Sequence, residues 1–167
     1  MAGEVTNIHP SVFQRFIHRL LMLRWVSAFL AKVLYRLDKF LFRLTRGRFV
    51  ITRLAGLPII QLTTTGAKTG QARTMPLVGI PDGEKIALIA SNFGQKRHPG
   101  WYHNLKVNPV CLVRFDGRAR NYIAHEASGA EHERYFLLAI SYYAGYQKYK
   151  ERAAPRKIPV IVLEPKR

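Results

Sequence analysis

The chain has 167 residues, of which 48% are hydrophobic and 11% aromatic, so it can bury the core of a single domain. Its 27 Lys and Arg residues outnumber 10 Asp and Glu residues, which gives a formal net charge of +17. This composition excludes global disorder, and the charge favours nucleic acid, an anionic membrane or an anionic small molecule as the partner. Cys111 is the only cysteine, which excludes an internal disulfide and a secreted, disulfide-stapled domain.

The first 48 residues are expected to form a basic helical segment. Residues 12–44 contain neither Pro nor Gly, and from Val26 onward apolar positions recur at alternating spacings of four and three, as on one helix face. A basic stripe lies beside that face and consists of Lys32, Arg36, Lys39, Arg43 and Arg46. Charges interrupt the apolar run, so the segment is not expected to span a bilayer. Residues 12–46 are expected either to lie on an anionic membrane surface or to pack on their own domain.

Residues 49–167 are expected to form the folded domain. Segments rich in β-branched and apolar residues predict strands at residues 59–65, 74–80, 85–91, 110–115, 118–124 and 158–163. Asp116-Gly117 predicts a tight hairpin between the fourth and fifth of these strands. Helical patterns cover residues 101–107 and 131–150. This order of elements predicts an α+β domain with an antiparallel, barrel-like sheet and no Rossmann unit.

One turn of the chain has the composition of an anion-binding loop. Residues 63–73 read Thr-Thr-Thr-Gly-Ala-Lys-Thr-Gly-Gln-Ala-Arg. Glycine lets backbone N–H groups approach a ligand closely, while Lys68 and Arg73 supply positive charge. A solvated hairpin explains the same pattern equally well. The spacing matches neither a Walker A loop nor G-x-G-x-x-G, so a nucleotide triphosphatase is not expected.

Three tyrosines, Tyr143, Tyr146 and Tyr149, are spaced three residues apart. On one helix they would share a sector of roughly 120°, whereas Tyr142 would point elsewhere. Such a wall could donate hydrogen bonds or a proton to a carbonyl or nitro oxygen, although core packing is the commoner role of aromatic residues on a helix. The six histidines lack the spacing of metal ligands, and no Gly-x-Ser-x-Gly motif supports a serine hydrolase.

Further motifs follow residues 63–73 along the chain, namely Ala90-Ser91, His98-Pro99-Gly100-Trp101-Tyr102-His103-Asn104-Leu105-Lys106-Val107-Asn108-Pro109, Tyr143-Ala144-Gly145-Tyr146-Gln147-Lys148-Tyr149 and Ile158-Pro159-Val160. Together these motifs resemble the deazaflavin-dependent nitroreductase family over residues 56–165 and stand in the family's order. The resemblance implies an antiparallel split β-barrel, similar to the FMN-binding split barrels, with an N-terminal amphipathic helix and peripheral helices. It also implies coenzyme F420 as the cofactor, an 8-hydroxy-5-deazaflavin with a phosphate and an oligoglutamate tail.

The resemblance assigns roles to residues of this sequence. Lys68, Thr69 and Arg73 would hold the phosphate side of the cofactor. The implied cofactor-binding residues are Ala67, Lys68, Thr69, Gln71, Arg73, Met75, Pro76, Leu77, Val78, Ile89, Ala90, Ser91, Asn92, Gly100, Trp101, Tyr102, His103 and Asn104. The implied catalytic residues of the substrate pocket are Tyr146, Ser91, Tyr143 and Tyr149. No metal is implied.

These roles imply an oxidoreductase that transfers a hydride from reduced F420 to a hydrophobic acceptor such as a quinone, an enone or a nitroaromatic compound. We expect Tyr146 or Ser91 to polarise the receiving oxygen. Ala67 stands where family members can carry a second cation, which weakens the expected grip on the tail. Val78 stands where nitroimidazole-reducing members have a tyrosine, so a quinone is the favoured acceptor.

Two alternatives stay open at this point. One is a non-enzymatic split-barrel module that binds a lipid or an anionic cofactor at a membrane surface, and the other is an FMN-dependent oxidoreductase of similar fold. The first ten residues carry no basic run, which is unlike a cleaved signal peptide. We therefore expect a cytoplasmic protein, peripheral on the inner face of the cell membrane if the helix binds lipid. No fingerprint of a DNA- or RNA-binding domain accompanies the charge, so no nucleic-acid partner is expected.

Overall fold

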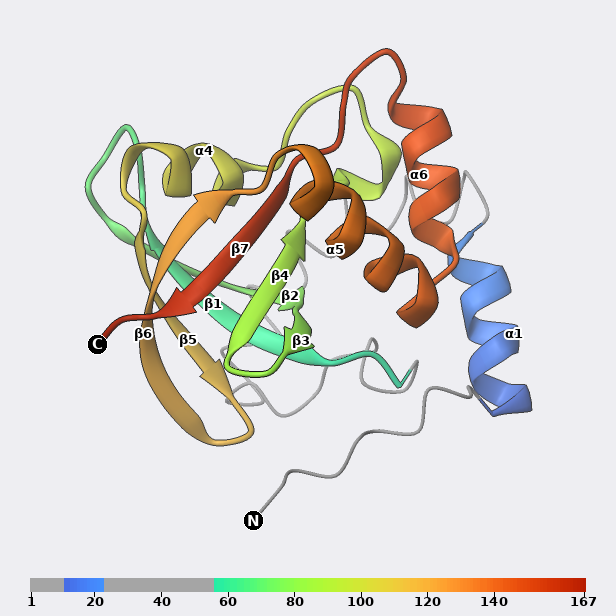
Figure 1. The fold of residues 1–167 in the computed structure, drawn as a ribbon, viewed down its shortest axis with the longest axis horizontal. Helices are drawn as coiled ribbons and strands as arrows, with labels where there is room; N and C mark the ends of the chain where they lie inside the picture. Colours follow the sequence, from blue (N-terminus) through green and yellow to red (C-terminus); the bar gives the residue numbers. More distant parts are fainter. Residues whose placement is uncertain (1–10, 23–55) are drawn as a thin grey trace.

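A computed structural model describes residues 11–22 and 56–167 of the chain. Figure 1 shows strands that curl around a core, with α4 near one end and α5 and α6 along one side. The described elements, in chain order, are α1 (Val12–Leu21), β1 (Ile59–Thr65), β2 (Ala72–Val78), β3 (Ile80–Asp82), β4 (Lys85–Ile89), the 3-10 helix η1 (Asn92–Gly94), α4 (Gly100–Val107), β5 (Val110–Phe115), β6 (Arg118–Glu126), α5 (Gly129–Tyr142), α6 (Gly145–Ala153) and β7 (Val160–Pro165).

The strands form one sheet in the order β2-β1-β5-β6-β7-β4-β3, and neighbouring strands run antiparallel. The β5–β6 hairpin turns at Asp116 and Gly117, whose φ angles of 47° and 78° are both positive, as a type I′ turn requires. The edge strand β2 also contacts β4, which lies next to the opposite edge strand β3, so the sheet curls towards a barrel. The predicted α+β antiparallel split barrel is confirmed.

Two clusters of buried side chains lie on the two faces of this sheet. Along β1 the buried positions alternate, and Ile60, Leu62 and Thr64 are all buried. One cluster joins Leu62 to Trp101 and Leu105 of α4. The other lies under α5 and α6 and contains the aromatic residues Tyr135, Phe136, Tyr143, Tyr146 and Tyr149. The second cluster is richer in buried phenols, because the first contains one buried tyrosine, Tyr122.

The predicted strand 74–80 is wrong in its bounds. β2 ends at Val78, and Ile80 already belongs to β3, which pairs with β4. Gly79 separates the two strands, and a Cβ atom there would lie 2.9 Å from side-chain atoms of Ile60 and Ile86. Only glycine fits so close to both strands, so the chain can change partners at this residue.

The predicted single helix over residues 131–150 is also wrong. The structure contains two helices, α5 and α6, which are separated at Tyr143 and Ala144. Tyr143 has an extended backbone, with φ −151° and ψ 104°, and its ring folds back over Gly145. The three tyrosines therefore do not share the face of one helix. Their rings still contact one another, because the Tyr143 ring packs over Gly145 at the start of α6.

Helix α1 lies beside α6 in Figure 1. The His18 ring meets the Tyr143 ring edge to face, with centroids 5.2 Å apart, and Arg152 donates a hydrogen bond to the backbone oxygen of Met22. Val12 and Phe16 are 76% and 64% exposed. Within the described residues, no helix is long and apolar enough to cross a membrane. The remainder of the predicted basic helix, residues 23–44, lies outside the described residues, and the domain boundary at residue 48 stays a prediction.

Candidate functional site

The turn between β1 and β2 is held in place by a side chain from α4. Asn104 accepts a hydrogen bond of 3.0 Å from the backbone N–H of Ala67 and donates one of 3.0 Å to the hydroxyl of Thr64. Both Asn104 and Thr64 are buried. A Cβ atom on Gly66 would lie 2.8 Å from the hydroxyl oxygen of Thr69, so the turn is packed closely around its glycine. The backbone amides that follow Thr65 are therefore fixed rather than loose.

Two cations of this turn have no partner in the part of the chain that the structure describes. The side chains of Lys68 and Arg73 are exposed, and neither forms a hydrogen bond or an ion pair with a described residue. Thr69 and Gln71 are exposed beside them. A fixed turn with two unpaired cations, a hydroxyl and an amide is suited to an anionic group such as a phosphate or a carboxylate.

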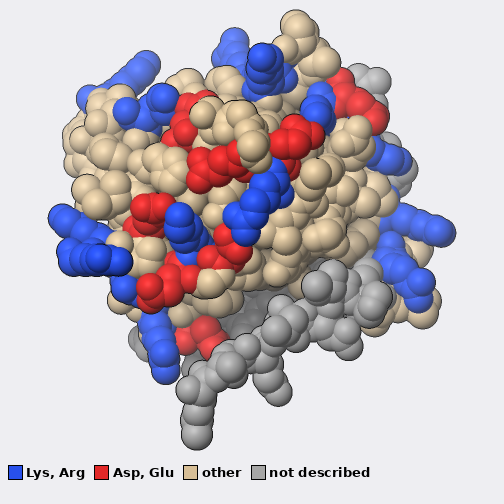
Figure 2. Space-filling view, in the orientation of Figure 1, with Lys and Arg blue, Asp and Glu red and all other residues tan. Residues whose placement is uncertain are grey.

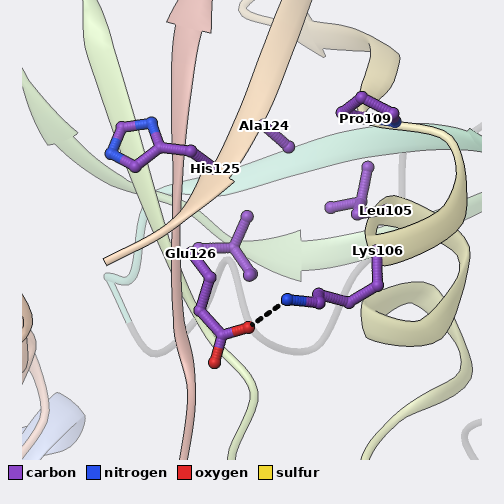
Figure 3. Close-up of a pocket in the computed structure, with 7 residues that line it drawn as sticks. Leu105, Lys106, Pro109, Ala124, His125 and Glu126 are labelled. Atoms are coloured by element: carbon purple, nitrogen blue, oxygen red, sulfur yellow. Dashed lines mark hydrogen bonds and ion pairs between the residues drawn. The ribbon is translucent and has the colours of Figure 1, made fainter. Parts of the chain in front are cut away.

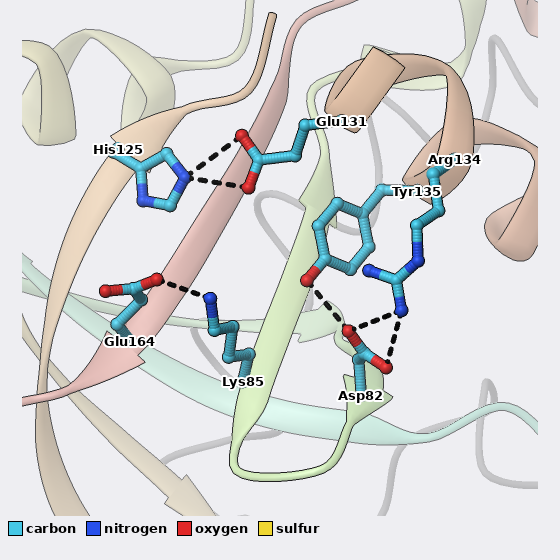
Figure 4. Close-up of polar contacts among 7 residues, drawn as sticks. All are labelled: Asp82, Lys85, His125, Glu131, Arg134, Tyr135 and Glu164. Carbon is cyan, nitrogen blue, oxygen red and sulfur yellow. Dashed lines mark hydrogen bonds and ion pairs between the residues drawn. The ribbon is translucent and has the colours of Figure 1, made fainter.

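Several basic side chains on another face of the molecule already form ion pairs with carboxylates. Figure 2 shows acidic and basic side chains interspersed over the face of β4, β6, β7 and α5. Figure 4 shows three of these contacts: Lys85 with Glu164 at 2.6 Å, Arg134 with Asp82 at 2.9 Å, and His125 with Glu131 at 3.1 Å. Because cations on this face have anionic partners, it offers a free anion less than the β1–β2 turn does.

Three phenols form a buried cluster at the start of α6. The ring centroids of Tyr143, Tyr146 and Tyr149 lie 5.6 to 6.2 Å apart, and the hydroxyls of Tyr143 and Tyr149 share a hydrogen bond of 3.3 Å. Burial raises the pKa of all three phenols, so they stay protonated and can donate hydrogen bonds. Tyr142 is half-buried at the edge of the same cluster.

Two buried hydroxyls, one in this cluster and one beside it, have no partner in the part of the chain that the structure describes. Tyr146 is 6% exposed and Ser91 is 7% exposed, yet neither side-chain hydroxyl forms a hydrogen bond with a described residue. Leaving a buried hydroxyl unpaired costs free energy, and such groups are candidates for binding a ligand. Ser91 directly precedes η1, and Phe93 of η1 meets the Tyr149 ring edge to face, with centroids 6.2 Å apart. The loop of Ser91 therefore lies against the tyrosine cluster.

The predicted ring-binding residues of β2 and β4 divide between the two faces of the sheet. Val78 and Ile89 pack in the same cluster as the three tyrosines. Met75, Leu77 and Ala90 pack in the other cluster, which includes Trp101. Side chains alternate along a strand, which explains why a continuous run such as 75–78 cannot line one pocket.

The predicted run 100–104 of α4 is divided in the same way. Trp101 is buried in the core. Tyr102 donates a hydrogen bond of 3.1 Å to Glu126, and its ring contacts those of His98 and His103. Within this run, Asn104 is the residue that holds the Lys68 turn. The α4 residues therefore brace the turn more than they line a common cavity.

In Figure 1 the turn between β1 and β2 and helix α6 lie at opposite sides of the view. No hydrogen bond or ring contact among the described residues joins the two groups directly. The structure thus brings together the predicted anion residues as one group, and Val78, Ile89 and the three tyrosines as another. Whether one ligand contacts both groups stays a prediction.

A pocket of about 190 Å³ opens between α4 and β6, and Figure 3 shows its lining. Lys106 there donates to Glu126 at 2.9 Å. The pocket is lined by Leu105, Lys106, Pro109, Ala124, His125, Glu126 and Ile161. None of these residues belongs to the predicted site.

Among the described residues, no group of three or more metal-ligating side chains could hold a metal ion. Cys111 is buried in β5, and burial raises the pKa of its thiol to about 12.

Sequence reasoning missed Arg156, which lies between α6 and β7 and forms hydrogen bonds with the Ser91 loop. Its guanidinium donates hydrogen bonds to the backbone oxygens of Ser91 and Gln95 at 2.8 and 3.0 Å. The partners are more than 60 residues away along the chain, so no local pattern could have indicated them. The sequence shows only a basic residue shortly before an apolar strand, and this pattern is too common to identify Arg156 as a functional residue.

Comparison with known proteins gives consistent matches. The family model described as F420H(2)-dependent quinone reductase matches residues 34–165. The F420H(2)-dependent quinone reductase Rv1261c of Mycobacterium tuberculosis strain H37Rv is 37% identical over 147 residues, which cover 84% of this chain and 95% of that protein. A solved structure of an F420-H2 dependent reductase, FDR-A, is 38% identical, with a TM-score of 0.60, and the match covers 64% of this chain and 94% of that one. A structure described as a domain-swapped dimer is 35% identical, with a TM-score of 0.62, over 79% of this chain and 96% of that one.

Proposed function

Because the chain belongs to the F420H(2)-dependent quinone reductase family, and is therefore a deazaflavin-dependent reductase with coenzyme F420 as its cofactor, we propose that it reduces a hydrophobic quinone. When bound, reduced F420 supplies two electrons as a hydride. The chain's own residues bind, orient and donate protons or hydrogen bonds.

The β1–β2 turn fits the anionic part of this cofactor. Lys68 and Arg73 have no partner among the described residues, and Asn104 fixes the backbone between Thr64 and Ala67. In the proposed complex, Lys68, Thr69 and Arg73 hold the phosphate side. Arg forms a fork of hydrogen bonds with such a group, while Lys acts as a point charge. Ala67 contributes its backbone N–H to Asn104 and adds no charge, so the cationic grip rests on two side chains.

The acceptor side of the proposal rests on the hydroxyl of Tyr146, which forms no hydrogen bond with residues 11–22 or 56–167. This phenol is buried and its pKa is raised by burial, so it remains protonated and can donate to an acceptor oxygen. Ser91 supplies a second buried hydroxyl without a partner among the described residues. A quinone gains negative charge on oxygen as it is reduced, and two donors directed to that oxygen would stabilise the charge. Tyr143 and Tyr149 use their hydroxyls on each other and support the ring of Tyr146.

Val78 favours a quinone over a nitroaromatic acceptor. It packs against the tyrosine cluster with an apolar side chain and offers no donor to a nitro group. A planar quinone ring gains from contact with this apolar side chain, and the acceptor oxygen would receive its hydrogen bonds from Tyr146 and Ser91 instead. Nitroaromatic compounds are therefore proposed as poorer acceptors.

The test measures cofactor binding and turnover separately. Fluorescence titration of the full chain with oxidised F420 and with FMN tests the cofactor, and we expect tight binding of F420 alone. Reoxidation of reduced F420 is then followed with a menaquinone analogue, an enone and a nitroimidazole. Faster turnover of the quinone supports the proposal. Binding of F420 without turnover of any of the three would instead support a non-enzymatic binding module, and preferential FMN binding would support a flavin enzyme.

We also propose that α1 docks on an anionic membrane surface. Its exposed side chains include Val12 and Phe16, with Arg15 and Arg19 on the same side of the helix. A helix with apolar side chains between cations is suited to the headgroup boundary of anionic lipids. Such docking would bring a lipid-dissolved quinone close to α6, since His18 of α1 contacts Tyr143.

Vesicle sedimentation tests this docking. We expect binding to phosphatidylglycerol vesicles that weakens with added salt, and little binding to phosphatidylcholine vesicles. Phe16→Ser should weaken binding to the anionic vesicles, while Leu137→Ser on α5 removes an apolar side chain of similar exposure elsewhere and should not. Equal losses in both variants would count against α1 as the docking surface.

A further inference from the structure

Arg156 forms hydrogen bonds with four groups of one loop. Its guanidinium donates to the backbone oxygens of Ala90 at 3.2 Å, Ser91 at 2.8 Å and Gln95 at 3.0 Å. It also donates to Nδ1 of His98 at 3.0 Å. A guanidinium has five N–H donors in a rigid plane, so it can hold several acceptors of one loop in a fixed arrangement. Residues 90–98 are thus wrapped around Arg156.

The conformation of this loop needs such support. Asn92 and Phe93 have φ angles of 49° and 58°, and both lie in the left-handed region that non-glycine residues rarely adopt. Residues of this kind cost free energy and persist only when their surroundings hold them. Here the conformation places Phe93 against Tyr149 and puts Gly94 beside the backbone of α6. Arg156 therefore supports the placement of Ser91 and η1 against the tyrosine cluster.

The hydrogen bond from Arg156 to His98 depends on the protonation state of the His98 ring. An arginine can only donate, so Nδ1 of His98 must carry a lone pair, and a neutral His98 has its proton on Nε2. A protonated His98 would lose this acceptor and would bring a second cation to within 3.0 Å of the guanidinium. Burial lowers the pKa of His98, the charges of Arg156 and His103 lower it further, and Glu126 opposes them. The uncharged ring of Tyr102 covers another side of His98.

We infer that Arg156 is a positioning residue of the reductase, which holds the Ser91 loop against the tyrosine cluster and does so fully only while His98 is neutral. The part that concerns turnover rests on the proposed function, because it requires Ser91 and Tyr146 to meet the acceptor. The part that concerns the Arg156–His98 contact rests on geometry alone. The two parts are tested by separate measurements.

Nitrogen NMR of the histidine rings tests the contact without cofactor. At neutral pH we expect the Nε2–H tautomer for His98 in the full chain. Arg156→Gln removes the neighbouring cation, so the midpoint of His98 titration should rise by roughly one unit. Lys157→Gln removes a charge from the adjacent, exposed residue and should leave the midpoint unchanged. A proton on Nδ1 at neutral pH, or the same midpoint in Arg156→Gln and the unmodified protein, would overturn the inference.

Turnover tests the positioning. Arg156→Gln should lower kcat with the quinone by about tenfold or more, as expected for misplaced groups, and change the Kd for oxidised F420 much less. Added guanidinium ion should restore part of kcat, which a general loss of folding would not allow. Lys157→Gln should match the unmodified protein. Equal kcat in Arg156→Gln and the unmodified protein would refute the positioning role.

The pH dependence gives an independent readout if Arg156→Gln folds poorly. In the unmodified protein, kcat should fall as the pH drops below the ordinary histidine value of 6.5, because burial lowers the pKa of His98 and the ring gains its proton only there. His98→Asn keeps an acceptor and cannot be protonated, so this acid-side fall should disappear. If kcat of His98→Asn falls at acid pH as in the unmodified protein, protonation of His98 is not the cause of the fall. If the unmodified protein neither binds F420 nor reduces a quinone, the proposed function fails while the NMR result still decides the contact.

Discussion

The amide of Asn104 donates a hydrogen bond of 3.0 Å to the hydroxyl of Thr64, which lies 40 residues earlier in the chain. The same amide accepts from the backbone N–H of Ala67 at 3.0 Å. One buried side chain of α4 therefore bridges the end of β1 and the first residues of the turn that carries Lys68. Cofactor binding at the turn should depend on this bridge even though Asn104 carries no charge.

Asn104→Leu should weaken F420 binding and destabilise the fold. The change keeps the side chain's size but leaves the Thr64 hydroxyl and the Ala67 N–H without their partner, at a cost of about 1–3 kcal/mol for each buried group. Urea unfolding gives the free energy of unfolding, and fluorescence titration gives the Kd for F420. Asn104→Asp serves as the matched variant, because it keeps the acceptor for Ala67. It should lie between Asn104→Leu and the unmodified protein in both measurements.

Lys68→Gln and Arg73→Gln should each weaken F420 binding and reduce its dependence on salt. Both side chains are exposed and lack a partner among the described residues, so they can attract an anion that is screened by added ions. Arg118→Gln removes the same charge from the β5–β6 hairpin and is the control. The Kd is measured at several salt concentrations. An equal change in the control would show that total charge, rather than the turn, sets the affinity.

Tyr146→Phe should lower kcat by about tenfold or more and leave the Kd for F420 nearly unchanged, because the hydroxyl is proposed to act on the acceptor. The free energy of unfolding should stay the same or rise by about 1 kcal/mol, since a buried hydroxyl without a partner among the described residues is removed.

Two matched tyrosine variants separate these effects. Tyr149→Phe removes the hydrogen bond to Tyr143 and should lower the free energy of unfolding by about 1 kcal/mol. Tyr142→Phe removes a hydroxyl from the half-buried edge of the cluster and should alter neither quantity. If Tyr146→Phe and Tyr142→Phe turn over the quinone equally fast, Tyr146 has no part in the reaction.

Local pattern predicts the strands well and the helices less well. β1 matches its predicted range of residues 59–65, because its run of β-branched residues favours a strand. The break between α5 and α6 escapes prediction, since helical spacing continues through Tyr143 and only Gly145 interrupts it. The break depends on a tertiary contact, the Tyr143 ring folded over Gly145.

The site is predictable only to the level of its motifs. The Lys68 turn and the tyrosines follow from residue types and family resemblance, whereas their supports do not. Asn104 and Arg156 form hydrogen bonds with residues 37 to 66 positions away in the chain, and a single sequence contains no local pattern that indicates such pairs. Alternation along β2 also shows why a motif cannot be transferred as a block, since Leu77 and Val78 pack in different clusters.

Asp82→Asn should lower stability at neutral pH and have little effect in acid. Asp82 accepts a hydrogen bond of 2.8 Å from Tyr135 and two from one guanidinium nitrogen of Arg134. Burial alone would raise the pKa of this carboxyl, but the Tyr135 and Arg134 contacts outweigh it and hold the pKa below its ordinary value of 3.8. The stability gained is therefore full above that value and is lost as the pH falls through the lower pKa of the folded state.

We expect a loss of about 1–3 kcal/mol at neutral pH for Asp82→Asn, since charged hydrogen bonds are replaced. Urea unfolding from neutral to acid pH measures the difference from the unmodified protein. Glu133→Gln on α5 changes a carboxylate for which the structure shows no ion pair with a described residue, and it serves as the control. A pH-independent difference for Asp82→Asn would contradict the ionic origin.

Gly145→Ala should disrupt the tyrosine cluster. A Cβ atom at this position would lie 2.2 Å from ring atoms of Tyr143 and 2.4 Å from its hydroxyl oxygen, so the ring must move. Overpacking of this kind costs about 1–3 kcal/mol, and the displaced ring would also lose its hydrogen bond to Tyr149 and its edge contact with His18. Gly100→Ala at the start of α4 is the stability control, because its Cβ atom would meet nothing within 4 Å and alanine favours a helix. Thermal unfolding should show a lower Tm for Gly145→Ala and an equal or higher Tm for Gly100→Ala, and equal losses in both would refute the close packing of Tyr143 on Gly145.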